Sequence, residues 1–596
     1  MCRIAGIVNP SFSTERLKQA VKEMCTTLSH GGPDDEGIYV CEHDSLVLGH
    51  RRLSIIDTSN AGHQPMSYQD NRYQISYNGE IYNYLELREQ LKTLGHNFKT
   101  HSDTEVILAA FAEWHTQSFE KLNGMFSFAI WDDTTQELFL ARDGSGIKPL
   151  YYAITPEGLA FASEIKAFQH IPYLQQANDN WKVFLLAFGH LPEPVTTLKN
   201  VKPLTKGSFI QYHVPTQTWI SDVFHKFSFK EAIGDRKTAI QSVKETFQKA
   251  VRRHMISDAP IGVFLSGGLD SSLIALLAGE GDKIDLNTLS IYFSDKEFSE
   301  KKYQDIVQER LKGTQQQFLL QEKDFDEYFP CILQQMDQPS CDGINTWFIS
   351  KYARQAGLKA VLSGIGGDEL FGGYPSFERI SAAISLQRLP NRLLNAFKKS
   401  SIKQLRRLTY LSIDGTIGKY LFLRGQFVPV EIAQQLDASE SEIFNLLSNL
   451  PLENNHIEEL SAFNQASWME FNLYMQNQLL RDADVMSMAH GLEIRVPFLD
   501  KELISLAMSI HSDVKYAGER NKQLLIDTFN DILPKAIWDR PKMGFSFPFR
   551  NWMLNNAYVK EKVLSNGKTG EANYRQFAAN KMHWSQLMAL LHTSNN

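Results

Sequence analysis

A run of serines and glycines at residues 266–272, SGGLDSS, has the composition of a loop that holds phosphate. An apolar run typical of a buried parallel strand, 261–265, precedes it, and a helix is expected to begin at about Ser271. Glycines let backbone amides close on an anion, and serine hydroxyls near a helix N-terminus can donate to it. A bare carboxylate in such a loop repels phosphate unless a divalent cation such as Mg²⁺ lies between them. The segment therefore predicts a magnesium-nucleotide site at Ser266, Gly267, Gly268, Asp270, Ser271 and Ser272.

A second glycine-rich segment, SGIGGDELFGGY at residues 363–374, follows another short apolar run, 360–363. Helical and strand-like patterns alternate between the two loops, as in a parallel α/β sheet. Ligands of such sheets bind at the carboxyl ends of the strands, so both loops are expected to face one site. Asp368 is then the expected second magnesium ligand beside Asp270. A solvated turn is the alternative interpretation of this segment.

The first residues, MCRIAGIV, lack the basic segment and long apolar run of a secretory signal. Removal of Met1 would make Cys2 the first residue. An N-terminal cysteine can act as a nucleophile, with its own α-amine or a water held by that amine as the proton acceptor. Cys2 is therefore a candidate nucleophile, and an incidental cysteine is the alternative.

Bulk properties narrow the class of protein. The 596 residues predict two or three domains, and the composition, 43% hydrophobic and 22% charged, is that of a globular protein. A net charge of −7 argues against a nucleic-acid or membrane-surface binder, and no apolar run approaches the roughly 20 residues of a membrane span. The five scattered cysteines indicate neither a disulfide framework nor a CxxC metal site, which favours the reducing cytoplasm.

The pattern of elements divides the chain. Strand-like segments occur at 124–131, 137–141 and 159–162, and periodicity fades at 216–236, where we expect a linker. Ile240, Val243, Phe247, Ala250 and Val251 then follow at helical spacing and lead towards the first glycine-rich loop. The expected organisation is a first domain at 2–215, the linker, and a second domain at 237–596.

The SGGLDSS segment resembles the pyrophosphate loop of the ATP pyrophosphatases, which split ATP into AMP and pyrophosphate while adenylating a substrate. The Walker pattern GxxxxGK[ST] is absent. By this resemblance ATP is the nucleotide, and four further residues would bracket the adenosine: Leu265, Ile291, Ser363 and Gly364.

Cys2 and the motifs HGGPDDEG (30–37), GHRRLSIID (49–57), YNGEIYNY (77–84) and HSDTEVIL (101–108) resemble the glutaminase domain of class II glutamine amidotransferases. These are N-terminal-nucleophile hydrolases with a four-layer αββα sandwich. The resemblance implies that a guanidinium pairs with the glutamine α-carboxylate, that two neutral donors form the oxyanion hole, and that two acids hold the α-ammonium. For the α-carboxylate the resemblance gives Arg52, within the binding segment Arg52, Leu53, Ser54, Ile55 and Ile56. For the oxyanion hole it gives Asn78 and Gly79, and for the α-ammonium it gives Glu80 and Asp103.

The C-terminal third is rich in helical patterns and contains segments at 479–500 and 540–548 that look like asparagine synthetase signatures. Lys542 would be a cation beside the pyrophosphate or the acyl-adenylate, with a solvated lysine as the alternative. Together, the motifs resemble glutamine-hydrolysing asparagine synthetases over nearly the whole chain. The resemblance implies an Ntn-hydrolase αββα sandwich, then an α/β parallel-sheet ATP-pyrophosphatase domain with a helix-rich C-terminal part, and a homodimer. It also implies ammonia release from glutamine at Cys2, an internal channel, and amidation of a carboxylate activated by ATP and Mg²⁺.

One difference from the family's sequence pattern leaves open which carboxylate is amidated. Asparagine synthetases commonly read SGEGSDE in the second loop, whereas this chain has Ile365 at the glutamate and Gly367 at the serine. Three hypotheses follow: amidation of aspartate to asparagine, which most of the signatures favour; amidation of another carboxylate such as a sugar uronate; and an inactive regulatory or binding homologue. The presence of Cys2, Asp270 and Asp368 disfavours the third.

Overall fold

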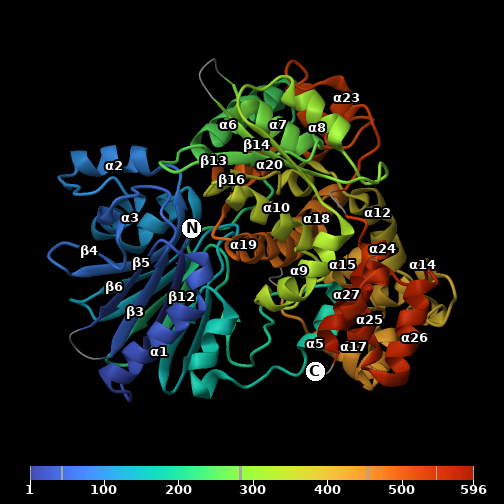
Figure 1. Ribbon diagram of the computed structural model, residues 1–596, viewed down its shortest axis with the longest axis horizontal. Coiled ribbons are helices and arrows are strands. Elements are labelled where there is room, and N and C mark those ends of the chain that lie inside the picture. Colours follow the sequence, from blue (N-terminus) through green and yellow to red (C-terminus); the bar gives the residue numbers. More distant parts are fainter. Residues whose placement is uncertain (1, 42–44, 281–284, 453–455, 545–546, 595–596) are drawn as a thin grey trace.

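The computed structural model describes residues 2–41, 45–280, 285–452, 456–544 and 547–594. In its N-terminal third, two six-stranded antiparallel sheets lie face to face (Figure 1). The first sheet has the order β10 (Lys202–Pro203), β8 (Tyr151–Thr155), β9 (Gly158–Ala162), β1 (Arg3–Val8), β3 (Leu46–Arg52) and β2 (Asp35–Val40). The second has the order β12 (Thr218–Val223), β11 (Ser208–His213), β7 (Glu137–Arg142), β6 (Gly124–Asp132), β5 (Tyr73–Ile81) and β4 (Met66–Tyr68).

Helices cover the outer face of each sheet. Alternation along the strands sends one set of side chains between the sheets, where Ile4 and Leu48 meet Trp131 and Leu140. The opposite set packs beneath α1 (Thr14–Thr27) on one side and beneath α2 (Tyr84–Thr93) and α3 (Asp103–Trp114) on the other. The expected αββα sandwich is therefore confirmed.

The second half is built on a five-stranded parallel sheet. Its order is β15 (Gln315–Leu319), β14 (Asn287–Tyr292), β13 (Ile261–Phe264), β16 (Ala360–Leu362) and β17 (Glu493–Arg495). Crossover helices join the strands, among them α7 (Leu269–Ala278), α8 (Lys301–Gln308) and α10 (Ile344–Gln355). Both glycine-rich loops follow directly from adjacent strands, β13 and β16, so the parallel α/β prediction is confirmed.

The helix expected before the first loop is α6 (Arg236–His254), which buries Val243, Phe247, Ala250 and Val251. The range predicted as linker, 216–236, contains β12, which pairs along its length with β11. The chain thus joins the last strand of the sandwich to α6 over residues 224–235.

The C-terminal part is helical, as expected (Figure 1). Its helices include α15 (Gly415–Arg424), α16 (Pro429–Leu436), α17 (Glu440–Ser448), α18 (Ala462–Met469), α19 (Arg481–Met488) and α27 (Trp584–Thr593). Between α18 and α19 the chain forms a π-helical segment, η8 (Glu470–Leu480). Among the described residues, none of the helices combines the length and hydropathy that a bilayer crossing requires.

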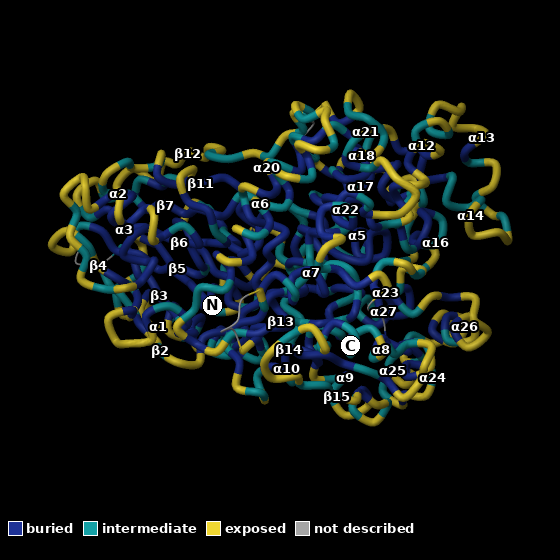
Figure 2. The backbone as a smooth tube through the Cα atoms, turned by 90° about the horizontal axis from the view of Figure 1, so that it is seen from above, coloured by how far each residue is buried: buried dark blue, intermediate teal, exposed yellow. Residues whose placement is uncertain are grey.

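The large apolar core of the second half extends into the first, where it includes Leu53, Tyr82, Met125 and helix α5 (Trp181–Phe188). Helix α5 lies in sequence between the sandwich strands β9 and β10 but packs among α15, α16, α17 and α27 (Figure 1). Backbone N–H groups of Gln426 and Phe427 donate to its carbonyls at Ala187 and Leu186, at 2.8 and 3.1 Å. The burial map shows buried chain running continuously between the two halves (Figure 2).

Candidate active sites

Cys2 lies immediately before β1 and is 8% exposed. Its backbone N–H donates to Asn78 Oδ1 at 3.1 Å, and the main chain of Leu53 hydrogen-bonds its thiol. The charges of Arg52 and Glu80 both act on that thiol. The fold therefore brings the N-terminus, the segment after β3 and strand β5 to one place, as the glutaminase resemblance implies.

Burial raises the pKa of the Cys2 thiol above its ordinary value. The thiol is therefore protonated at neutral pH and must lose a proton before it can attack. The α-amine freed by removal of Met1 would be the nearest proton acceptor, because it belongs to the same residue.

Strand β5 carries three of the predicted glutamine-site residues in succession. Asn78 is fully buried and Glu80 is 4% exposed. Asn78 Nδ2 and Glu80 Oε2 are buried polar atoms without a hydrogen-bond partner. A Cβ on Gly79 would lie 2.1 Å from the Met125 carbonyl oxygen, so this position requires glycine. An open amide donor and an open carboxylate oxygen thus lie on the strand beside Cys2, and buried polar groups in this state are normally satisfied by a ligand or by water.

Arg52 and Asp103 are held by their neighbours. The Arg52 guanidinium donates to the carbonyls of Asp57 and Ser59, the latter at 2.9 Å. Asp103, the first residue of α3, accepts from the Tyr77 hydroxyl at 2.9 Å and the Ile81 N–H at 3.0 Å. Burial raises the pKa of Asp103. Leu53, Ser54 and Ile55 are buried and Ile56 is half-buried.

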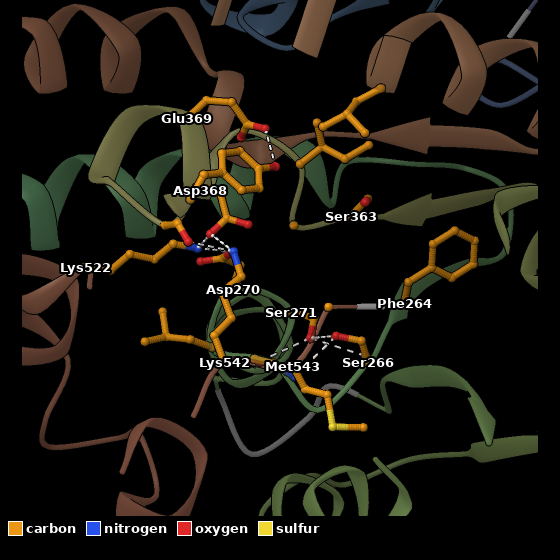
Figure 3. A pocket seen from close by; sticks show the side chains of 18 of the residues that line it. Phe264, Ser266, Asp270, Ser271, Ser363, Asp368, Glu369, Lys522, Lys542 and Met543 are labelled. Atoms are coloured by element: carbon orange, nitrogen blue, oxygen red, sulfur yellow. Dashed lines mark hydrogen bonds and ion pairs between the residues drawn. The ribbon is translucent and has the colours of Figure 1, made fainter. Parts of the chain in front are cut away.

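A second site is a cavity of about 730 Å³ at the carboxyl ends of β13, β14 and β16 (Figure 3). Of the residues predicted to bind nucleotide or metal, ten line it: Leu265, Ser266, Gly268, Asp270, Ser271, Ile291, Ser363, Gly364, Asp368 and Lys542. Gly267 and Ser272 are not among the lining residues. Gly267 has φ +88°, which glycine favours, and its carbonyl accepts from Arg540 Nη2 at 2.9 Å; Ser272 is fully buried in α7.

The first loop is braced by its own hydroxyls. Ser266 Oγ lies 2.9 Å from Ser271 Oγ and accepts the Gly268 N–H at 3.2 Å. Gly268 is the N-cap of the ten-residue helix α7, and no side chain caps that end. The first amides of α7 therefore face the cavity with the positive end of the helix dipole, an arrangement suited to phosphate.

Lys522 lies between the two predicted metal ligands (Figure 3). Its Nζ is 2.5 Å from Asp270 Oδ2 and also contacts Asp368 Oδ1, while Lys542 Nζ is 2.7 Å from Asp368 Oδ1. Burial raises the pKa of Asp270. Burial also opposes ionisation of Asp368, but Lys522 and Lys542 outweigh it and lower that pKa to about 2. Asp368, which contacts both ammonium groups, is thus the better stabilised anion of the pair.

Sequence reasoning missed Lys522 and Arg540. Lys522 stands alone in an ordinary polar stretch, and only the fold brings it to Asp270, 252 positions away. Arg540 lies in the 540–548 signature segment and contacts Glu300 Oε1 at 2.6 Å as well as Gly267. The position of Arg540 in that segment was the only signal that could have found it.

The second glycine-rich loop differs from the SGEGSDE pattern of asparagine synthetases at Ile365 and Gly367, and the structure places both residues. Ile365 lines the cavity with an apolar side chain. A Cβ on Gly367 would lie 2.7 Å from Asp270 Oδ1, so the absence of a side chain at this position leaves room for that carboxylate. The neighbouring Glu369 accepts the Gly366 N–H at 3.1 Å and the Tyr374 hydroxyl at 2.8 Å. Burial, followed by the charge of Asp368, raises the pKa of Glu369 to about 7.

Comparisons with known proteins match both halves. The family model for asparagine synthase matches residues 242–591, and that for a glutamine amidotransferase domain matches residues 1–222. The chain is similar to glutamine-hydrolyzing asparagine synthetase 1 of Bacillus subtilis, with 33% identity over 94% of this chain and 90% of that protein. It is also similar to synthetase 3 of the same organism, with 30% identity over 91% of this chain and 87% of that one. A solved B. subtilis glutamine PRPP amidotransferase aligns with 53% of this chain and 81% of its own at 16% identity, but its TM-score of 0.30 is too low to support an inference.

Proposed function

Because the chain belongs to the asparagine synthase family and is a glutamine-dependent carbon–nitrogen ligase of that type, we propose that it converts aspartate to asparagine with ammonia released from glutamine. ATP would activate the acceptor carboxylate, leaving AMP and pyrophosphate. The observation that carries the proposal is the pair of open polar atoms beside Cys2, Asn78 Nδ2 and Glu80 Oε2. They match the needs of a glutamine γ-amide under attack and of its α-ammonium.

In the proposed first half-reaction, the Cys2 thiol transfers its proton to the α-amine, and its sulfur attacks the glutamine γ-carbonyl carbon. Asn78 Nδ2 and the Gly79 N–H donate to the oxygen as it becomes negative. Glu80 and Asp103 hold the α-ammonium, and Arg52 holds the α-carboxylate. The C–N bond breaks, ammonia leaves with the proton from the amine, and water then hydrolyses the thioester to glutamate and free Cys2.

The second half-reaction needs a cation between ATP and two carboxylates. Asp270 Oδ1 is buried without a hydrogen-bond partner, so a ligand position is open on one of the two proposed Mg²⁺ ligands. Mg²⁺ keeps most of its coordination for water and phosphate oxygens, so Asp270 and Asp368 fit it without a third acid. When bound, it would neutralise phosphate charge. Ser266, Gly268 and Ser271 would hold the pyrophosphate oxygens, while Lys522 and Lys542 would stabilise the charge that develops as pyrophosphate leaves.

The acceptor carboxylate oxygen would attack the α-phosphorus of ATP, the bond to pyrophosphate would break, and an acyl-adenylate would form. Ammonia then attacks the acyl carbon, AMP leaves and a proton is lost, giving the amide. Passage through the protein interior would keep ammonia from being protonated in bulk water. None of the five cysteines, all of which the structure describes, forms a disulfide, which supports the proposal that this takes place in the reducing cytoplasm; the family resemblance implies a homodimer.

Ile365 favours a second acceptor class. Its side chain lines the cavity where asparagine synthetases commonly have an acid, and isoleucine can neither accept a proton nor pair with a cation. An acceptor such as a sugar uronate, with a larger and less charged body, would place more neutral surface against it. Uronate amidation is therefore the second candidate function.

The test is release of pyrophosphate by the purified protein with ATP, Mg²⁺ and glutamine, with aspartate, galacturonate or no acceptor. Aspartate-dependent release with matching asparagine supports the first candidate, and release with the uronate alone supports the second. A Cys2→Ala variant should lose glutamine-dependent product but retain product made from ammonium chloride. Cys331→Ala, at an exposed thiol, is the matched control. A wild-type protein that forms no glutamate from glutamine would contradict both candidates.

A further inference from the structure

Arg495 joins the two halves at the glutamine site. It is the last residue of β17, at the edge of the parallel sheet, and its side chain is fully buried. Its Nη2 lies 3.4 Å from Oε1 of Glu80, which belongs to strand β5 of the sandwich. A residue from the synthetase half therefore contacts a carboxylate expected to hold glutamine in the other half.

The other donors of Arg495 are already engaged. Nε donates to Glu493 Oε1 at 2.5 Å, and Nη1 donates to the carbonyls of His254 and Ile256 at 2.8 and 2.5 Å. Nη2 has no hydrogen-bond partner, so Glu80 is the charge that it faces. A guanidinium has five donors in a rigid fork, and three held donors fix the direction of the remaining two. The three hydrogen bonds that direct Nη2 thus all come from the synthetase half, and the guanidinium carbon lies 5.9 Å from the centre of the Tyr82 ring of the sandwich.

The positive charge of Arg495 favours the ionised form of Glu80. Burial and then the nearby negative charge of Glu493 raise the pKa of Glu80 well above its ordinary value, and Arg495 is the largest of the effects that lower it. A protonated Glu80 could not form an ion pair with the α-ammonium of glutamine. Its second oxygen, Oε2, has no hydrogen-bond partner and is available to the substrate.

We propose that Arg495 is a positioning residue that holds the Glu80 carboxylate ready for the α-ammonium of glutamine, so that the glutamine site is completed by the synthetase half. This rests on the proposed function, in which Glu80 contacts glutamine. The backbone carbonyl of Arg495 also accepts the Ser363 N–H at 2.8 Å, and Ser363 lines the ATP cavity. One residue therefore touches both sites, through its side chain and its main chain.

The experiment uses the full chain with Arg495→Lys. Lysine keeps the positive charge but lacks the planar guanidinium with its five donors. Glutamine hydrolysis gives KM and kcat, and amide formation from ammonium chloride reports the synthetase half without glutamine. We expect KM for glutamine to rise about tenfold, equivalent to about 1.4 kcal/mol, with a smaller change in kcat. Ammonium-dependent activity should stay within about twofold, because lysine leaves the backbone bond to Ser363 in place.

Two further variants separate positioning from a structural role. Arg253→Lys is the matched control: Arg253 is also a buried arginine, 2.8 Å from Glu502, but does not touch Glu80. Its KM for glutamine should not change. In Glu80→Gln the target of Arg495 is gone, so adding Arg495→Lys should raise KM much less than it does in the wild type.

An unchanged KM in Arg495→Lys, additive effects in the double variant, or equal loss of glutamine- and ammonium-dependent activity would each overturn the proposal; the last would make Arg495 a structural brace only. Failure of the proposed function looks different, because the wild-type protein itself would then form no glutamate.

Discussion

The Lys522 ammonium takes the place between Asp270 and Asp368 that a divalent cation would need. Because one ammonium contacts both carboxylates, the proposed binding of magnesium there would require it to move, and the phosphates of ATP would offer it a new partner. Its backbone adopts φ +58°, a conformation uncommon for lysine, which indicates that the chain is constrained to bring this side chain inward. Lys522 is therefore expected to serve the reaction rather than the stability of the cavity alone.

We predict that Lys522→Met lowers pyrophosphate release about a hundredfold or more, because a charge that stabilises the leaving pyrophosphate is lost. Glutamine hydrolysis should be preserved, since Cys2 lies in the other half. Lys535→Met, at a lysine whose side chain is 75% exposed, is the control and should change neither rate. Full pyrophosphate release by Lys522→Met would show that the ammonium only fills the site before ATP binds.

Ionisation of Glu369 is expected to make the stability of the folded protein depend on pH. Its pKa is raised to about 7 from an ordinary value of 4.5, so the folded protein holds this proton more tightly than the unfolded chain does. Stability from this group is therefore full below about pH 4.5 and falls as the pH rises towards 7. We predict that Glu369→Gln, which cannot ionise, lacks this loss. Thermal unfolding from pH 5 to 8 should show the variant gaining a few degrees relative to wild type as the pH rises. A constant difference would place the ionisation elsewhere.

At the scale of elements, the second glycine-rich loop packs closely against the first. A Cβ on Gly367 would lie 2.7 Å from both Cγ and Oδ1 of Asp270. We predict that Gly367→Ala displaces this carboxylate and slows pyrophosphate release at least about tenfold, since a small misplacement of a catalytic group is costly. Gly234→Ala, where an added Cβ meets nothing within 4 Å, is the matched control. An unaffected Gly367→Ala enzyme would mean that Asp270 can shift without cost.

Sequence patterns predicted the elements whose signals are local. The run 261–265 and the glycines after it located β13 and the first loop, and the spacing from Ile240 to Val251 located α6. Lys522 carried no local signal of its role, and Arg495 carried only its place in the 479–500 segment, because each acts on a carboxylate far away in sequence. The same holds for α5, whose apolar sequence predicts burial but not that it packs among helices of the other half.

The π-helical segment η8 shows how one element can serve both halves. Its Tyr474 and Leu479 line the cavity at the carboxyl ends of β13, β14 and β16. From the same segment, Gln478 Oε1 lies 3.2 Å from His190 Nδ1, and Asn477 Oδ1 accepts the Glu193 N–H at 3.0 Å. The wider turn of a π-helix changes which side chains share a face, and such segments occur often at functional sites. In this chain the segment links the cavity wall to the connection between α5 and the sandwich strand β10.

At the scale of the whole molecule, Asp484 of α19 holds the halves together beside Cys2, the proposed nucleophile. Its carboxylate is 2.8 Å from Nη1 of Arg3, the residue after Cys2, and 3.4 Å from Nζ of Lys148. All three side chains are buried, and Asp484 is a counter-ion from the other half for both cations, while Arg3 also pairs with Glu164 of the sandwich at 2.6 Å. Removing one partner of a buried ion pair costs about 3 kcal/mol or more, and Glu164 offsets part of this cost at Arg3.

We predict that Asp484→Asn lowers the thermal unfolding midpoint and loosens the interface, so that more ammonia escapes before it reaches the acyl-adenylate. The ratio of glutamate to AMP formed should rise above the wild-type ratio, while saturating ammonium chloride restores amide formation. Glu502→Gln, in a pair whose acid is 45% exposed, is the control and should change stability by less than about 1 kcal/mol and the ratio not at all. If Asp484→Asn lowered the midpoint but left the ratio unchanged, the buried pair would hold the fold together without governing the transfer of ammonia.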